Sequence, residues 1–328
     1  MRLLLLGGTN FVGRVVAEEA LARGWEVTAL NRGTQPAPAG VTALLGDRTA
    51  EGGLAALAAG EWDAVVDTWS GAPTAVRDSA RLLAGRVGHY GYVSSRSVYD
   101  YPLARGADES AKVVGSSPDA EGEVPYAEAK RGAELALEAE FGGRALLARA
   151  GLILGPHENI GRLPWWLNRI ARGGPVLAPG PYDLPLQYID VRDLAGWLLD
   201  AAAARFGGAC NVVSPAGHTT MGELLEACVR VTGSDADLRW TDPERILAAG
   251  VEPWTELPIW LAPGELNDFL HGASVDRAVA AGLRCRPVGE TVEDTWAWLR
   301  SIGGVAPQRA DRPKVGLDPE REAELLRG

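Results

Sequence analysis

Apolar and polar positions in the first half of the chain alternate between two periods. Short apolar runs that predict buried strands cover residues 3–6, 26–30, 41–45, 63–68 and 89–95. Apolar residues at helical spacing cover 12–22, 52–60, 74–86 and 126–142, and a further apolar run covers 144–154. This repeated order of strand and helix is typical of an α/β fold with a doubly wound parallel sheet, covered by helices on both faces.

The pattern changes beyond Gly155, where the chain is rich in Gly, Pro and Trp and has one helix-like piece at 163–173. Residues 186–203 predict a strand and a helix that return to the sheet, followed by a strand at 209–213. Short helices and proline-rich turns follow from Thr219. We therefore expect a sheet domain of 1–155 completed by about 186–214, a smaller portion of 156–185 and 215–303, and a C-terminal loop and helix of 304–328.

Composition and charge narrow the class of protein. The run at 3–6 is too short for a signal peptide, and no run reaches the roughly 18 apolar residues of a membrane span. Three widely spaced cysteines without a CxxC pair argue against a disulfide framework or a zinc site, and they fit a reducing, cytoplasmic compartment. The four histidines show no metal-ligand spacing. A formal charge of −11 disfavours nucleic acid as a partner.

The stretch GGTNFVG at 7–13 directly follows the first predicted strand and opens the first predicted helix. Gly7 permits a tight turn, Gly13 allows the helix to pack closely on the sheet, and Asn10 tolerates left-handed backbone conformations where a middle glycine is usual. Such a turn directs backbone N–H groups and the positive end of the helix toward a pyrophosphate. The alternative is a purely structural turn. We predict a dinucleotide site that uses Gly7, Thr9, Asn10, Phe11, Val12 and Gly13.

The end of the second predicted strand discriminates between the two nicotinamide cofactors. An acidic residue there usually binds the ribose 2′-hydroxyl of NAD, and a basic one binds the 2′-phosphate of NADP. This chain has Asn31 and Arg32, and a guanidinium can bind a phosphate through two hydrogen bonds. We expect NADP(H) to be preferred over NAD(H), the alternative being that Arg32 is a solvated charge. Residues after the next two strands complete the expected cofactor site: Asp47, Arg48, Thr68 and Trp69.

Tyr126 and Lys130 lie four positions apart in a predicted helix and therefore share one helix face. A nearby ammonium stabilises a phenolate and lowers the tyrosine pKa toward neutrality. Tyr126 can then exchange a proton with a substrate oxygen while a hydride passes to or from the cofactor. The predicted strand at 89–95 ends in hydroxyl residues, and ligands of doubly wound sheets gather at the carboxyl ends of strands.

The order of these motifs resembles the extended short-chain dehydrogenase/reductase superfamily, in its NAD-dependent epimerase/dehydratase branch. The resemblance rests on the N-terminal glycine turn, YVSSRSVY at 92–99, YAEAK at 126–130 and RAGLILGP at 149–156, and it covers roughly residues 1–300. It implies a Rossmann fold, a nicotinamide cofactor and a homodimer. The chloroplast stem-loop-binding proteins and other atypical members of the superfamily share the GGTxFxG form of the turn.

The same resemblance implies roles for single residues. It makes Tyr126 the acid and base, and it makes Lys130 the residue that holds the nicotinamide ribose and tunes the tyrosine. Ser95 would hydrogen-bond the reacting oxygen, with Ser94 and Ser97 as the alternatives.

Two departures from the family pattern bear on the substrate. Dehydratases of the family carry an Asp–Glu pair directly after the catalytic hydroxyl, where this chain has Arg96 and Ser97. Sugar-nucleotide enzymes usually carry an arginine for the diphosphate at the place of Leu186, for which Arg162 and Arg169 are the candidate replacements. Apolar residues here predict either a pocket for a less polar substrate or packing between the two portions. The candidate pocket residues are Ser97, His157, Trp165, Trp166 and Leu186.

We interpret the chain as an NADP(H)-dependent oxidoreductase that reduces a carbonyl or imine of a small, partly apolar molecule through Ser95, Tyr126 and Lys130. The first alternative is an NAD(P)-dependent sugar-nucleotide epimerase, ranked second because of Leu186. The second alternative is a cofactor-sensing regulator or an RNA-associated protein without turnover. The atypical glycine turn favours it, whereas the intact catalytic set and the acidic charge argue against it.

Overall fold

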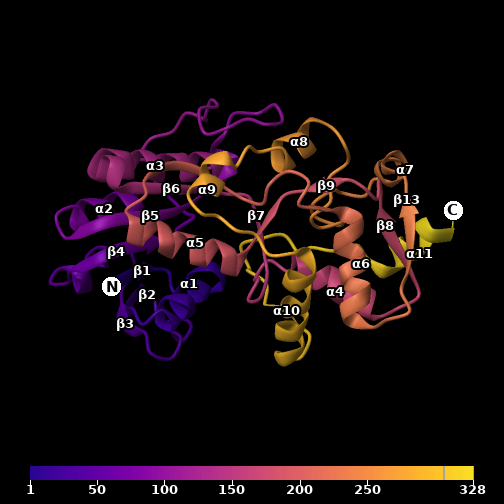
Figure 1. Ribbon diagram of the computed structural model, residues 1–328, viewed down its shortest axis with the longest axis horizontal. Coiled ribbons are helices and arrows are strands. Elements are labelled where there is room, and N and C mark those ends of the chain that lie inside the picture. The colour runs from indigo at the N-terminus through magenta and orange to yellow at the C-terminus, as the bar shows by residue number, and fades with distance from the viewer. Residues whose placement is uncertain (306, 328) are drawn as a thin grey trace.

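Seven parallel strands form the central sheet in the computed structural model, which describes residues 1–305 and 307–327 (Figure 1). The sheet has the order β11-β6-β5-β4-β1-β2-β3, so the chain winds outward in both directions from the boundary between β1 and β4. Ligands of such sheets bind at this reversal, beyond the carboxyl ends of the strands. The strands are β1 (Arg2–Leu6), β2 (Glu26–Asn31), β3 (Thr42–Leu45), β4 (Trp62–Asp67), β5 (Val87–Ser95), β6 (Ala145–Ala150) and β11 (Gly208–Val212).

Helices cover both faces of the sheet and account for the unbroken leucine run of β1. Successive side chains of a strand point to opposite faces. Leu3 and Leu5 pack in one buried cluster with α1 (Phe11–Ala22) and α5 (Val191–Ala204). Leu4 and Leu6 pack in another cluster, with α2 (Thr74–Leu83) and α3 (Tyr126–Phe141). The predicted doubly wound α/β fold is confirmed.

Three sequence predictions differ from the observed elements. The single strand expected at 144–154 is two strands, β6 and β7 (Leu152–Leu154), which separate at Gly151. A Cβ on Gly151 would lie 2.6 Å from Cγ2 of Val213, so the chain approaches its neighbour there as only glycine permits. The second difference concerns the strand within 186–203 expected to return to the main sheet. It is β10 (Tyr188–Asp190), which pairs with β7 outside that sheet, and β11 is the strand that joins β6.

The third difference concerns 52–60, where the predicted helix is only the short 3₁₀ turn η1 (Ala55–Leu57). Glycines at 52, 53 and 60 flank the apolar residues on both sides. Glycine costs a helix more conformational entropy than any other non-proline residue, which limits the helical stretch to one turn.

A third buried cluster forms the C-terminal lobe around α4 (Arg162–Ala171), α6 (Met221–Thr232) and α10 (Val288–Ser301). Two tryptophans anchor it through their indole N–H groups: Trp166 donates to the Pro258 carbonyl at 2.7 Å and Trp260 to the Gly180 carbonyl at 3.0 Å. The remaining elements are β8 (Pro175–Pro179), β9 (Pro185–Leu186), β12 (Thr219–Thr220), β13 (Asp237–Thr241), α7 (Pro243–Ala248), α8 (Glu265–His271), α9 (Asp276–Ala280), α11 (Pro319–Arg327), η2 (Arg96–Val98) and η3 (Gly142–Arg144). Over the described residues, no helix combines the length and apolar character needed to cross a membrane.

Candidate active site

The turn between β1 and α1 depends on its two outer glycines. Gly7 has φ +102°, and a Cβ on Gly13 would lie 2.0 Å from the Gly7 carbonyl oxygen. The predicted close packing of the first helix turn on the strand end is therefore present. The left-handed conformation expected of Asn10 is not, because its backbone is extended (φ −128°) and Phe11 takes the positive φ of 35° instead. The backbone N–H groups that open α1 face the carboxyl edge of the sheet.

A cavity of about 700 Å³ lies at this edge, beside the glycine turn. Apart from Lys130, every residue predicted for the cofactor lines it: Gly7, Thr9, Asn10, Phe11, Val12, Gly13, Asn31, Arg32, Asp47, Arg48, Thr68 and Trp69. Three further residues come from the C-terminal segment, namely Arg309, Ala310 and Asp311. With Asn159, which also lines the cavity, six separate parts of the sequence form one concave surface on the strand ends.

Asn31, the last residue of β2, and Arg32, which follows it, offer different groups to this cavity. Arg32 is exposed on its wall. Asn31 accepts the Gly33 N–H through Oδ1 at 2.9 Å, while its Nδ2 is buried without a partner among the residues described. Asp47 accepts both the N–H and the hydroxyl of Thr49, and these bonds lower the pKa of the Asp47 carboxyl. The buried amide donor of Asn31 fits a ligand that brings an acceptor to this wall.

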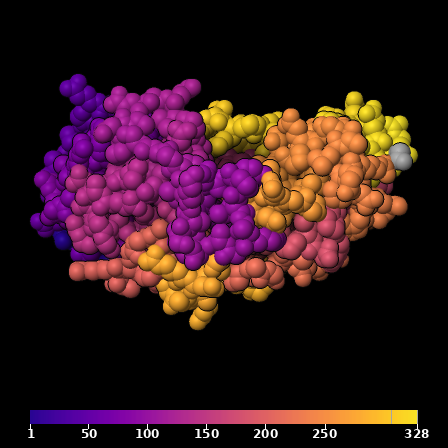
Figure 2. Space-filling view, turned by 90° about the horizontal axis from the view of Figure 1, so that it is seen from above, coloured from indigo at the N-terminus to yellow at the C-terminus, as the bar shows by residue number. Residues whose placement is uncertain are grey.

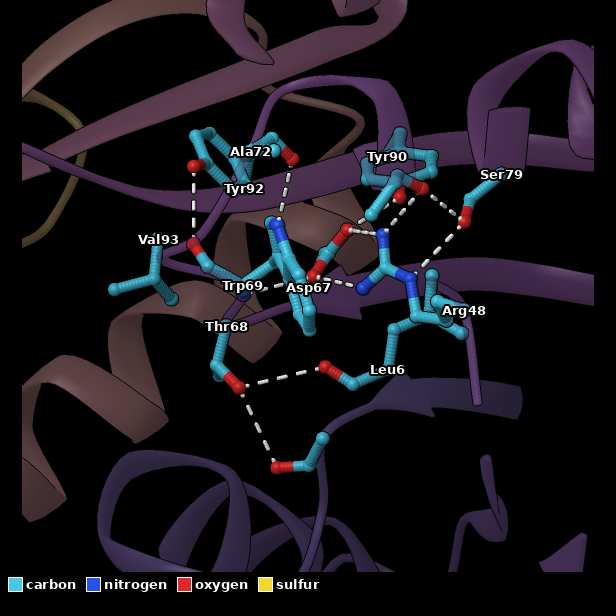
Figure 3. A network of polar contacts seen from close by, with 12 residues as sticks. Leu6, Arg48, Asp67, Thr68, Trp69, Ala72, Ser79, Tyr90, Tyr92 and Val93 are labelled. Carbon is cyan, nitrogen blue, oxygen red and sulfur yellow. Dashed lines mark hydrogen bonds and ion pairs between the residues drawn. The ribbon is translucent and has the colours of Figure 1, made fainter. Parts of the chain in front are cut away.

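Arg48 lines the cavity, but its guanidinium is committed elsewhere (Figure 3). It donates to both carboxylate oxygens of Asp67, at 2.7 and 2.8 Å, and to the Ser79 hydroxyl at 3.1 Å. Tyr90 donates its hydroxyl to the same carboxylate at 2.7 Å, and the Trp69 N–H donates at 2.9 Å. Asp67 is fully buried. Arg48 therefore braces the loop after β4 and offers no free charge to a cofactor.

The Lys130 ammonium is buried between this loop and β5. It donates to the Trp69 carbonyl at 2.5 Å and to the Val93 carbonyl at 2.7 Å. It lies 4.7 Å from the Tyr92 ring centroid and 5.9 Å from that of Tyr126. Burial lowers the pKa of Lys130 to about 7. An ammonium has three donors, so one stays free for a ligand beside Tyr126.

The three candidate serines have different hydrogen-bond partners. Ser94 donates to the buried Glu134 carboxylate at 2.7 Å and is thereby held in the sheet-to-α3 contact. Ser95, at the end of β5, donates to Ser97 Oγ at 3.1 Å and accepts the Ser97 N–H at the same distance. Tyr126 opens α3 and is 38% exposed. Lys130 thus lies beside the Tyr126 ring and bonds Val93, two residues before Ser95 at the carboxyl end of β5.

The sequence did not reveal that the C-terminal segment returns to this site. The Arg309 N–H donates to the Asn159 carbonyl at 3.0 Å, and the Arg309 side chain pairs with Asp311 at 2.6 Å. The Arg312 guanidinium lies 5.3 Å from the Tyr126 ring centroid. The positive charges of Arg309 and Arg312 add to the lowering of the Lys130 pKa. A loop has no periodicity that indicates its path, so the only available signal was the pair of arginines.

The residues predicted to form an apolar substrate pocket mostly serve packing. Trp166 and Leu186 are fully buried in the C-terminal core, and Trp165 packs edge-on against Trp166 at 4.7 Å. His157 lies 3.9 Å from Glu18 and 5.5 Å from the Trp298 ring, and burial lowers its pKa. The packing alternative accounts for the burial of Trp166 and Leu186, which lie within the C-terminal core and do not line the cavity beside the glycine turn.

Of the two arginines considered as diphosphate ligands, only Arg162 is available. Arg169 is buried and pairs with Glu322 of α11 at 2.5 Å. Arg162 opens α4, and its guanidinium lies 5.1 Å from the Trp254 ring centroid. The Arg162 Nε is buried and has no hydrogen-bond partner in the described part of the chain. Burial and the positive charge of Arg312 lower the pKa of Arg162, whereas Glu158 and Tyr126 oppose that shift.

Comparisons with known proteins agree with this geometry. The model of the family described as "NAD dependent epimerase/dehydratase family" matches residues 3–213. A Burkholderia cenocepacia protein is 24% identical, with a TM-score of 0.68 over 92% of this chain and 98% of that one. The UDP-glucose 4-epimerase of Thermus thermophilus, solved with NAD, is 21% identical, with a TM-score of 0.64 over 93% of this chain and 100% of that one.

Bordetella bronchiseptica WbmG, solved with NAD and UDP, is 18% identical, with a TM-score of 0.68 over 95% of this chain and 99% of that one. No curated protein matches the sequence. The structural likenesses establish a shared fold, and the family model covers well over half of the chain. The chain belongs to the NAD dependent epimerase/dehydratase family.

Proposed function

We propose that the protein is an NAD(P)-dependent epimerase that inverts a hydroxyl-bearing carbon of a sugar nucleotide. The observation that carries the proposal is the position of Lys130, beside Tyr126, against the end of β5 that Ser95 terminates, and bonded to the carbonyl of Trp69, which lines the cavity. Family membership and the UDP-containing relative support it. The sugar-nucleotide interpretation ranked second because Leu186 stands where an arginine usually binds the diphosphate, and Arg162, whose Nε has no partner among the described residues, offers a replacement cation.

The cavity has the features that a dinucleotide requires. Gly7 and Gly13 permit the tight turn that opens α1, because a Cβ on Gly7 would lie 2.6 Å from the Thr68 hydroxyl and one on Gly13 would lie 2.0 Å from the Gly7 carbonyl oxygen. The unpaired amide of Asn31 supplies a donor at the ribose side. A bound nicotinamide ring would supply a reversible two-electron acceptor next to Tyr126.

The side chains of the chain itself perform the proton chemistry. The Tyr126 phenolate takes the proton of the substrate hydroxyl and later returns it to the same oxygen. Ser95 orients that oxygen from the end of β5. The Lys130 ammonium, held by two carbonyls, stabilises the phenolate through its positive charge. Arg162 supplies a cation for the diphosphate, in place of the arginine that sugar-nucleotide enzymes of the family usually carry at the position of Leu186.

Cofactor selection gives the first prediction. We propose that Arg32 binds the 2′-phosphate of NADP(H), although the solved relatives described above contain NAD. Arg32→Ala should weaken NADPH binding about tenfold, because two charge-assisted hydrogen bonds are lost at an exposed site. NADH binding should stay within about twofold. Titration of nicotinamide fluorescence measures both, and equal affinity of the unaltered protein for the two cofactors would refute the assignment.

The pH profile gives a second prediction. The pKa of Lys130 is lowered to about 7, and the charge of Arg312 contributes to that lowering. Arg312→Gln removes the charge, so the Lys130 pKa rises and the ammonium persists to higher pH. The alkaline limb of kcat should therefore move to higher pH. Arg312→Lys keeps the charge and serves as the control; a shift to lower pH in Arg312→Gln would contradict the mechanism.

One experiment separates epimerase from reductase. The purified protein, loaded with NAD or with NADP, is incubated with single UDP-hexoses and UDP-hexuronic acids, without any reductant. Proton NMR should show one sugar converting to its epimer, while absorbance at the reduced-nicotinamide band stays constant. Net accumulation of reduced cofactor would indicate a dehydrogenase, and consumption of added NADPH by carbonyl compounds alone would restore the reductase interpretation.

A further inference from the structure

Unpaired buried donors cluster beside the catalytic serine. Folded proteins leave few buried polar atoms without a partner, so a cluster of them indicates something that completes it. Within residues 1–305 and 307–327 the unpaired buried side-chain atoms belong to five residues: Asn31, His89, Arg96, Arg162 and His271. Asn31 lies in the cofactor cavity. The last three of these residues form a connected group, described next.

Arg96 directly follows Ser95 and occupies a place where dehydratases of the family carry an acid. It is 2% exposed, and its Nη1 donates to the Leu270 carbonyl at 2.8 Å. Its Nε has no partner, and in the described part of the chain no carboxylate lies within ion-pair distance of it. Burial lowers the pKa of Arg96 to about 10, which still leaves the guanidinium charged at neutral pH. A buried, unpaired charge is costly, and a protein gains from it only when something binds there.

His271 ends α8 and faces the same interior. The His271 Nδ1 lies 3.0 Å from the Gln187 nitrogen and 3.3 Å from the Gln187 carbonyl oxygen; with Nδ1 accepting the shorter of these bonds, the neutral ring carries its proton on Nε2. That Nε2 is buried and has no acceptor among the described residues. The charge of Arg96 helps to keep the ring neutral by lowering its pKa, which burial brings to about 4. Arg96 and His271 therefore present hydrogen-bond donors only.

The outer side of this group is closed by the chain that follows β5. The Gly106 N–H donates to the Gly272 carbonyl at 2.6 Å, and Tyr101 packs edge-on against Phe269 at 5.6 Å. Figure 2 shows this purple stretch packed beside the orange stretch around α8. Arg105 is engaged outside, with Asp268 at 2.8 Å. The chain after β5 therefore packs against α8, which carries His271 and the Leu270 carbonyl that Arg96 binds.

The Trp254 ring lies near both His271 and Arg162. Its centroid is 6.4 Å from that of His271 and 5.1 Å from the Arg162 guanidinium. If Arg162 serves the diphosphate, the donors of Arg96 and His271 belong to a different part of the substrate. The Nε–Nη2 edge of a guanidinium matches the two oxygens of a carboxylate.

We propose that Arg96 and His271 form a binding site for a carboxylate on the sugar, so that the substrate is a nucleotide-linked sugar acid. The inference rests on the proposed function for the nucleotide part only. Arg96 is a specificity residue in this scheme, and it takes no part in proton transfer.

The test compares ligands that differ in one carboxylate. With NAD bound, calorimetry should show that the protein binds UDP-glucuronate about 10- to 100-fold more tightly than UDP-glucose, as expected for charge-assisted hydrogen bonds. Arg96→Met and His271→Gln should each reduce that ratio toward one. His89→Gln is the matched control, because His89 also has an unpaired buried ring nitrogen but lies near the start of β5. An unchanged ratio in Arg96→Met would overturn the proposal.

Stability provides a second readout that does not depend on the nucleotide. Arg96→Met removes an unpaired buried charge, so its unfolding temperature without ligand should rise. Free glucuronate, but not glucose, should raise the unfolding temperature of the unaltered protein and not that of Arg96→Met. If this holds while no UDP-sugar binds, the carboxylate site stands and the sugar-nucleotide function fails. If inorganic phosphate raises the unfolding temperature of the unaltered protein but not of Arg96→Met, and glucuronate does neither, the site binds phosphate and the carboxylate assignment fails. If Arg96→Met has a lower unfolding temperature and no ligand changes that of the unaltered protein, Arg96 has a purely structural role and the proposal fails.

Discussion

Tyr126→Phe should lower kcat for sugar interconversion by about 10²–10⁴-fold, the usual contribution of a positioned acid or base. The substitution removes only the hydroxyl, and Tyr126 is partly exposed at the start of α3, so the fold loses no buried hydrogen bond. The dinucleotide cavity is lined by other residues, and cofactor affinity should stay within about twofold. A large loss of turnover with intact cofactor binding is therefore the expected signature.

The measurement pairs NMR-detected turnover with nicotinamide fluorescence titration of the same sample. Tyr182→Phe is the matched control, because Tyr182 is similarly exposed but packs on Trp240 in the C-terminal lobe. Its turnover should not change. Retained activity in Tyr126→Phe would mean that the proton passes through another group, and Ser97 would be the first residue to test.

The sequence was sufficient for the sheet, its covering helices and the cofactor cavity, because each of these depends on local patterns. The glycine turn, the strand ends and the Tyr126–Lys130 spacing are short-range features, and the parallel topology brings all strand ends to one edge. The sequence predicts one strand at 144–154, because apolar periodicity does not show that Gly151 divides the run into two strands of different sheets.

Features that depend on distant parts of the chain were not predictable in the same way. The sequence predicts Arg48 as a cofactor ligand, whereas its guanidinium donates hydrogen bonds to Asp67 and Ser79. Trp166 and Leu186 could line a pocket or fill a core, and only their neighbours decide between the two. The route of Arg309 and Arg312 across the site is likewise a tertiary property. Propensity and spacing describe a residue's own segment, whereas these roles are set by its partners.

Asp67→Asn should lower the free energy of unfolding by about 3–5 kcal/mol, the cost of breaking a buried ion pair by removing one partner. Asp67 is fully buried, and the side chain of Arg48 is 6% exposed. With the carboxylate gone, the Arg48 guanidinium stays buried without a counter-charge. The Trp69 N–H loses its charged acceptor at the same time, which loosens the loop whose carbonyl holds Lys130. Cofactor affinity should therefore fall together with stability.

Urea denaturation followed by tryptophan fluorescence measures the change, and Asp119→Asn is the control. Asp119 also pairs with an arginine, Arg77 at 2.6 Å, but its side chain is 65% exposed. A surface pair contributes roughly 0–1 kcal/mol, so this variant should be nearly neutral. The double variant Arg48→Met with Asp67→Leu removes both charges and should recover much of the loss, since no uncompensated ion remains. A double variant as unstable as Asp67→Asn would show that the hydrogen bonds to Tyr90 and Trp69, rather than the ion pair with Arg48, stabilise this edge of the sheet.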